Sequence, residues 1–274
     1  MEWMNFSVYA KTIALCWIIG TILLTFFRKN NYIRRIGNFL MFAGIFVIIL
    51  YITLLWIKLE HPPLKTVGDT RLWYSLFLSL TGLIIFFRWQ DNWNLFVRSS
   101  FLLLTIFVSL LFLYLNVKTP ENFNKSLLPA LQSVWFVPHV VVYIFGYSLV
   151  GLATLIALTN LFQHYFMKDE IKNIYLADNL IYTGFAFLTF GLIFGAFWAK
   201  QAWGHYWTWD IKETWALITW LIYLLYIHIR YYYPELKIFP YWALCIAFAV
   251  LLISWFGINY LPPATDSIHV YSRN

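Results

Sequence analysis

The sequence predicts an all-α polytopic membrane protein, a helical bundle of about eight transmembrane helices. Of its 274 residues, 62% are hydrophobic and only 11% are charged, and the mean hydropathy is +0.69. A soluble domain carries about a quarter charged residues, so the apolar excess has to face lipid. Eight apolar runs are long enough, or nearly so, to cross about 30 Å of hydrocarbon at ~1.5 Å per residue. They span residues 8–27, 36–57, 72–87, 99–116, 136–162, 179–199, 212–232 and 239–258.

Charged or proline-containing segments separate these runs in order along the chain. Residues 28–35, 61–63 and 88–98 divide the first four, of which the third and fourth are the shortest. Residues 119–129, 168–172 and 230–237 contain the later boundaries, and none of these gaps has room for a soluble domain. We therefore expect four N-terminal transmembrane helices in residues 1–127. We expect residues 128–274 to form a second group of four helices, which includes a tryptophan-rich segment at 203–220.

The distribution of charge excludes some functions and suggests an orientation. The net charge of +7 is spread over short loops, with no long basic run of the kind that binds nucleic acid. Residues 28–35 hold four basic residues, and an early basic loop usually stays in the cytoplasm. The overall count decides nothing, because ten of the 19 basic residues fall on that side and nine on the other. We expect both termini and the tryptophan-rich segment on the outer side.

The tryptophan-rich segment holds five of the 15 tryptophans in 18 positions. Flat indole faces suit a planar apolar ligand such as haem, and their N–H groups suit its polar edge. The alternative is that they are ordinary anchors at the membrane interface. Asp210 and Glu213 also have the spacing of a capping box at the start of the seventh span. Gly204 is expected in a turn or a close backbone approach.

The six histidines differ in their predicted depth. His139 opens the fifth span and His269 lies in the tail, so both are expected on the outer side, beside the tryptophans. His228 lies deep in the seventh span, where an ionisable group is by default a functional candidate. His61 and His164 are expected to be polar residues at helix ends, and His205 to be incidental. Neutral imidazole is a common axial ligand of haem iron, so His139 and His269 could hold a macrocycle between them.

The run from Trp203 to Trp220, with its Trp-x-Trp-Asp and Lys-Glu-Thr-Trp elements, resembles the WWD segment of the cytochrome c assembly protein family. The Ile-His-Ile-Arg that follows is similar to the CcsA (ResC-like) subunit of the system II cytochrome c synthetase. So are residues 129–133 before His139 and 256–260 before His269. The resemblance covers about 128–271. Ile211 stands where the family usually has proline, and the tail around His269 departs from the usual pattern.

This resemblance implies a haem b (iron protoporphyrin IX) cofactor and a set of residues that bind it. His139 and His269 would be the external iron ligands, and His228 would ligate a second haem within the membrane, opposite a histidine from a CcsB-type partner. The other residues implied are Trp203, Gly204, Tyr206, Trp207, Trp209, Asp210 and Trp215. The implied reaction is thioether attachment of haem to the CxxCH segment of apocytochrome c on the outer face. It proceeds by positioning, without a catalytic acid or base, and other proteins would reduce the thiols.

Three alternatives differ in what they require. A HemX-like protein or a haem exporter of the same superfamily would keep the tryptophan segment without attaching haem. A membrane b-type electron carrier would need paired intramembrane histidines, and His228 is the only deep one. A transporter unrelated to haem would need broken helices or several buried charges at mid-membrane. The resemblance implies a bacterial inner membrane or a thylakoid-type membrane as the location.

Overall fold

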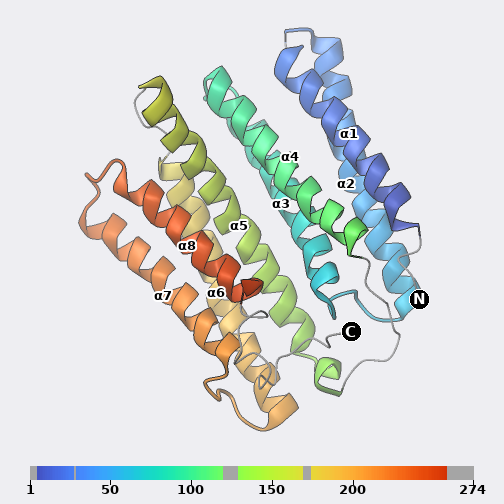
Figure 1. Cartoon of the computed structure of the whole chain (residues 1–274), viewed down its shortest axis with the longest axis vertical. Coiled ribbons are helices and arrows are strands. Elements are labelled where there is room, and N and C mark those ends of the chain that lie inside the picture. The colour runs from blue at the N-terminus through green and yellow to red at the C-terminus, as the bar shows by residue number, and fades with distance from the viewer. Residues whose placement is uncertain (1–4, 28, 120–128, 169–173, 258–274) are drawn as a thin grey trace. The chain divides into compact units, whose positions relative to one another are not determined.

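The computed structural model of the chain describes residues 5–27, 29–119, 129–168 and 174–257 (Figure 1). The regular elements in these ranges are all helical, which confirms the predicted fold class of a polytopic helical membrane protein. They are eight α-helices, a short 3-10 turn and one turn of π-helix. The chain divides into two compact units, residues 1–127 and 128–274, and each is described by itself.

The first unit holds α1 (Phe6–Phe26), α2 (Asn31–Leu59), α3 (Val67–Trp89) and α4 (Leu95–Lys118). Helix α1 packs against α2 and α4, and α3 packs against α4 and α2. The third and fourth spans are longer than the sequence predicted, because polar caps begin each helix ahead of its apolar run. Thr66 and Asp69 form a capping box on α3, and the Asn94 side chain accepts from the Val97 amide on α4.

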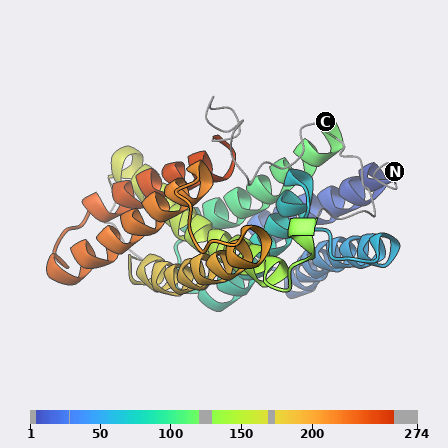
Figure 2. The same ribbon diagram turned by 90° about the horizontal axis from the view of Figure 1, so that it is seen from below.

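The second unit holds α5 (Phe136–Phe162), α6 (Ile174–Trp203), α7 (Ile211–Tyr232) and α8 (Phe239–Trp255). Helix α5 continues into the π-helical turn Gln163–Met167. It packs closely along α6, α8 packs against α5 and α7, and α7 packs against α6. Figure 1 and Figure 2 both show α7 and α8 side by side. Glycines allow the close approach of α5 and α6: a Cβ at Gly184 would lie 2.7 Å from Val150.

Six helices, α1 to α6, are long and apolar enough to cross a membrane. Two of the eight predicted spans fall short of that standard for identifiable reasons. Helix α7 has 22 residues but includes Lys212, Glu213 and Arg230 among many aromatic side chains. Helix α8 has 17 residues and ends at Trp255, so it is about 26 Å long at ~1.5 Å per residue, shorter than the predicted run to residue 258.

The antiparallel order of the second unit brings four helix termini together at one end. The start of α5, the end of α6, the start of α7 and the end of α8 lie there (Figure 1). The opposite end carries exposed aromatic residues typical of a membrane interface. They include Tyr165, Tyr175, Tyr231, Tyr232, Tyr233 and Trp242. The first end contains the tryptophan-rich segment and is the candidate functional site.

Candidate functional site

His139 lies in the first turn of α5 and its ring is held by α6. Its Nδ1 atom is 2.9 Å from the carbonyl oxygen of Gly191. A carbonyl can only accept a hydrogen bond, so Nδ1 carries the proton, and in the neutral ring the lone pair is on Nε2. A Cβ at Gly195 would lie 2.8 Å from the His139 Cε1 atom, so the ring can approach α6 this closely only because residue 195 is glycine. This is the arrangement that commonly orients a metal-ligating histidine.

Two aromatic rings enclose the His139 imidazole. Tyr143, one turn later on α5, meets it edge-on with ring centroids 5.0 Å apart. The buried Trp198 of α6 lies 5.4 Å away at an interplanar angle of 31°. Trp198 in turn contacts Trp203, at 5.0 Å, so the imidazole is linked to the first tryptophan of the tryptophan-rich segment.

The chain segment before α5 also holds this arrangement in place, through contacts with α6. The Trp198 indole N–H donates to the carbonyl of Ala130 at 2.7 Å, and the Ser133 hydroxyl donates to Gln201 Oε1 at 2.6 Å. Trp135 stacks against Phe194 of α6. The motif at residues 129–133, which the sequence associated with His139, therefore anchors the start of α5 to α6. That anchoring also fixes the Trp198 indole, which faces the histidine.

The backbone between α6 and α7 contains two unusual conformations. Gly204 has φ +85°, in the left-handed region that glycine adopts at little cost, so the expected turn is present. Trp209 also has a positive φ, +59°, which is strained for a bulky side chain. Lys200 stabilises the turn, because its Nζ donates to the Gly204 carbonyl at 2.8 Å and lies over the Tyr206 ring at 5.4 Å.

Asp210 and Glu213 form the capping box that their spacing predicts. The Asp210 carboxylate accepts from the Lys212 amide at 2.8 Å. Glu213 is buried, and its Oε2 atom accepts from the backbone amides of Thr208 and Asp210 at 2.8 and 3.2 Å. The two carboxylates therefore shape the loop that presents Trp207 and Trp209, and this explains both residues without a ligand.

Trp207 and Trp209 contact each other but differ in how far they are exposed to solvent. Their rings meet edge-on with centroids 5.8 Å apart, and 69% of Trp209 is exposed. The Trp207 Nε1 atom is buried and has no hydrogen-bond partner among the residues that the structure describes. The Tyr143 hydroxyl is likewise buried and has no hydrogen-bond partner among the described residues. A buried donor without a partner costs about 1–3 kcal/mol, which favours an acceptor supplied by a ligand or water.

Trp220, the last tryptophan of the segment, packs between helices and does not contribute to this surface. Trp220 donates from Nε1 to the Thr189 hydroxyl at 2.9 Å and packs against Phe185, so it joins α7 to α6. Trp215 is half-buried on α7, and its carbonyl accepts from the Thr219 hydroxyl in the next turn. His205 is exposed in the turn.

His228 lies at the opposite end of α7 from the tryptophan-rich segment, as its position in the sequence predicts. Its Nδ1 atom is 2.8 Å from the Leu224 carbonyl oxygen, so Nδ1 is protonated and Nε2 carries the lone pair. The side chain is exposed on the same face of α7 as Leu221 and Leu225. His269, the other predicted external ligand, lies outside the described residues.

Sequence reasoning did not identify four residues that surround His139: Tyr143, Gly191, Gly195 and Trp198. A signal for two of them is present, because Gly191-Leu192-Ile193-Phe194-Gly195 is a Gly-x-x-x-Gly element, which marks close helix packing in membranes. This element does not reveal which side chain, on which helix, packs against the two glycines.

Comparison with known proteins agrees with the family resemblance of the sequence motifs. Residues 64–264 match the family model described as cytochrome C assembly protein. A cytochrome c biogenesis protein CcsA from Mesostigma viride is 28% identical over the full length of both chains. One from Welwitschia mirabilis is 31% identical over 88% of each, and one from Trachelium caeruleum is 29% identical over 94% of this chain and 92% of its own. The match includes α3 and α4, so the predicted limit of the resemblance at about residue 128 was wrong.

Proposed function

The chain belongs to the cytochrome c assembly protein family, with CcsA proteins among its relatives, and on this premise we propose that it binds haem b and presents it for attachment to apocytochrome c. The observation that carries the proposal is the imidazole of His139. A backbone carbonyl holds it in the tautomer that places the lone pair on Nε2, which is the form of imidazole that ligates metals, and two aromatic rings flank it.

The residues at this end of the second unit fit haem in their chemistry. His139 would ligate the iron through Nε2, and His269 would be the second iron ligand. The exposed indole of Trp209 and the neighbouring rings would contact the macrocycle. The buried N–H of Trp207 and the Tyr143 hydroxyl are donors for carboxylate oxygens such as those of propionates. The surface around the macrocycle would be shaped by the remaining residues of the segment, which are Trp203, Gly204, Tyr206, Asp210 and Trp215.

The chain itself would act by positioning rather than by acid–base chemistry. Bound haem supplies vinyl groups, across which the thiols of a CxxCH segment add to form thioether bonds. His139 would hold the metal in a fixed orientation, while the rings around it would limit access of water. The CxxCH histidine could replace one ligand of the chain, and this would favour release of the product.

A second position is proposed around His228. His228 stands 16 residues after Lys212, which is at the start of α7 and so at the same end of the unit as His139. The separation along the helix is about 24 Å at ~1.5 Å per residue, too far for one macrocycle to reach both His228 and His139. The exposed Nε2 side of His228 faces out of the unit, where a polar group in lipid is costly. A CcsB-type membrane partner would supply the opposing histidine and cover this face. Haem would enter at His228 and leave at His139.

The proposed setting is a bacterial inner membrane or a thylakoid-type membrane, with the tryptophan-rich segment and both termini outside. Apocytochrome c and the thiol-reducing proteins would act on that side. A HemX-like protein or a haem exporter would use the same residues without attaching haem. A b-type electron carrier finds less support, because His228 and His139 are at opposite ends of the unit.

Absorbance spectroscopy of the purified chain, alone and with its partner, tests the proposal. The chain alone should carry one low-spin haem at the outer position, and the complex should carry two. Coexpression with an apocytochrome c should then yield covalently attached haem. Bound haem without attachment would favour the HemX-like or exporter function, and absence of haem from both preparations would refute haem binding.

A further inference from the structure

Near its C-terminal end, helix α7 carries His228 and Arg230 on opposite faces. His228 is exposed, whereas Arg230 is buried, with 6% of its side chain exposed. Two residues correspond to about 200° of rotation at ~100° per residue, so the two side chains leave opposite faces of the helix. Only one of them can face the interior of the unit in any rotational position of α7. The rotation of α7 therefore decides which of them is presented outward.

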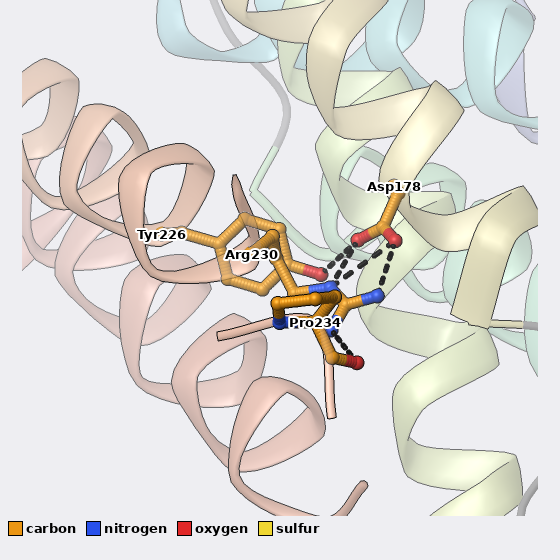
Figure 3. Close-up of polar contacts among 4 residues, drawn as sticks. All are labelled: Asp178, Tyr226, Arg230 and Pro234. Atoms are coloured by element: carbon orange, nitrogen blue, oxygen red, sulfur yellow. Dashed lines mark hydrogen bonds and ion pairs between the residues drawn. The ribbon is translucent and has the colours of Figure 1, made fainter. Parts of the chain in front are cut away.

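Arg230 is held on the interior side by a buried cluster (Figure 3). Its Nη2 atom lies 3.0 Å from Asp178 Oδ2 on α6, and its Nε atom lies 3.1 Å from Asp178 Oδ1. The hydroxyl of Tyr226, one turn earlier on α7, donates to Asp178 Oδ1 at 2.6 Å. Arg230 Nη1 donates to the carbonyl of Pro234 at 3.2 Å, just after the helix ends. The guanidinium fork thus engages one carboxylate from two positions, which sets direction as well as distance.

Apolar burial alone cannot select this rotation. The exposed face of α7 presents Ile218, Leu221 and Leu225, while the buried face presents Thr219, Tyr223 and Tyr226. The outward face is therefore the more apolar of the two. Lipid chains are as apolar as leucine, so no hydrophobic force turns one face inward within a membrane. Close packing and directional polar contacts have to do so, and the strongest polar contact between α7 and α6 is the Arg230–Asp178 pair.

We propose that Asp178, Tyr226 and Arg230 are positioning residues that fix the rotation of α7 and so present His228 out of the unit. Buried ion pairs often contribute little net stability, and a role in selecting one arrangement is their best-supported use. In the fixed rotation, the His228 Nδ1–H bonds to its own helix and Nε2 points outward. That this outward nitrogen binds a metal rests on the proposed function; the rotation does not.

The rotation can be measured on the chain alone in lipid nanodiscs, with no haem or partner present. A nitroxide label is placed at His228→Cys, after Cys16→Ser and Cys245→Ser remove the native thiols. Labels at Leu225→Cys and Thr219→Cys give the exposed and buried references. Collision with molecular oxygen, which concentrates in lipid, reports which way each label faces. With the cluster intact, the label at 228 should match the label at 225.

The decisive variant replaces the whole cluster by apolar residues, Asp178→Leu with Tyr226→Phe and Arg230→Met, so that no buried hydroxyl loses its acceptor. It should accumulate and melt close to the parent, because apolar replacement of a buried pair is often neutral. Its label at 228 should nevertheless give two spectral components and at least a twofold lower oxygen collision rate. An unchanged label in this folded variant would overturn the proposal.

If the apolar variant does not accumulate, Arg230→Lys tests the same proposal. Lysine keeps the charge and loses the fork, so the label at 228 should again fall toward the buried reference, and an unchanged label would refute the proposal. Because these measurements contain no haem, a failed rotational lock cannot be confused with failed haem binding. Loss of inner-site haem on His228→Ala tests the proposed function separately.

Discussion

The Nδ1 atom of His139 and the carbonyl oxygen of Gly191, 52 residues apart in the chain, are separated by 2.9 Å. The contact joins the first turn of α5 to the middle of α6 and determines which nitrogen of the imidazole is protonated. Within an α-helix the Gly191 carbonyl also lies opposite the amide of residue 195, where the absence of a side chain makes room for the ring. One Gly-x-x-x-Gly element thus supplies both the acceptor and the space for this histidine.

Replacing His139 by glycine should remove the outer haem and abolish cytochrome c maturation. Glycine leaves the coordination position vacant and makes room for a small ligand, so added imidazole should restore part of both. Absorbance spectra and haem-stained gels with and without imidazole provide the measurement. His205→Gly, an exposed change in the turn, is the matched control and should mature cytochrome normally. Unchanged maturation in His139→Gly would remove it from the ligands.

Gly195→Ala should displace the His139 ring without removing it. The added methyl would lie 2.8 Å from Cε1, and such overpacking costs about 1–3 kcal/mol. We expect a lower melting temperature and a shifted or weakened outer-haem spectrum. Gly257→Ala is the control, because the nearest atoms to its methyl in the described chain belong to the flexible Ile253 side chain, at 3.3 Å. Equal spectra for the two variants would show that the contact at Gly195 does not position the ring.

Trp207, Trp209 and Asp210 replaced together by alanine should lower haem content at the outer site by about tenfold, equivalent to ~1.4 kcal/mol of binding free energy. The protein should still insert and accumulate, because most of α7 packs elsewhere. Haem per protein, measured by pyridine haemochrome absorbance, checks this. Full retention of haem would favour the alternative that these indoles are interfacial anchors.

The two possible roles of Asp210 can be separated by single changes. Asp210→Asn keeps an effective N-cap and removes the charge, whereas Asp210→Ala loses about 1 kcal/mol of helix stability. If the role is structural, the asparagine variant should match the parent in melting temperature and haem content, and the alanine variant should fall in both. A loss of haem in the asparagine variant at unchanged melting temperature would instead assign Asp210 a direct role at the ligand.

His228→Ala, purified with the partner, should lose the inner haem signal and deliver less haem to the outer site. The residue is exposed and bonds only to its own helix in the described chain, so the protein should fold normally. His164→Ala, in the π-helical turn at the same end of the unit, is the comparison. Normal maturation by His228→Ala would exclude the proposed route through the membrane.

The membrane class and much of the local structure could be predicted from the residues. The fifth run, predicted at 136–162, is helical over that range, and the Asp210–Glu213 capping box is present. Both depend on neighbours in sequence: an unbroken apolar run allows little but a helix in lipid, and a cap needs residues three apart. The third and fourth spans were predicted too short because an apolar run does not register a polar first turn that its own cap stabilises.

The sequence by itself determined that this chain is helical, that it belongs in a membrane, and that His139 shares an end with the tryptophan-rich segment while His228 does not. These follow from alternation of the spans along the chain. Only the tertiary structure decided which atoms meet: His139 with Gly191, Trp198 with Ala130, and Asp178 with Arg230. The reason is that lipid leaves both faces of a helix apolar, so the pattern of hydrophobic residues does not specify rotation. Close packing at glycines and directional polar contacts select it.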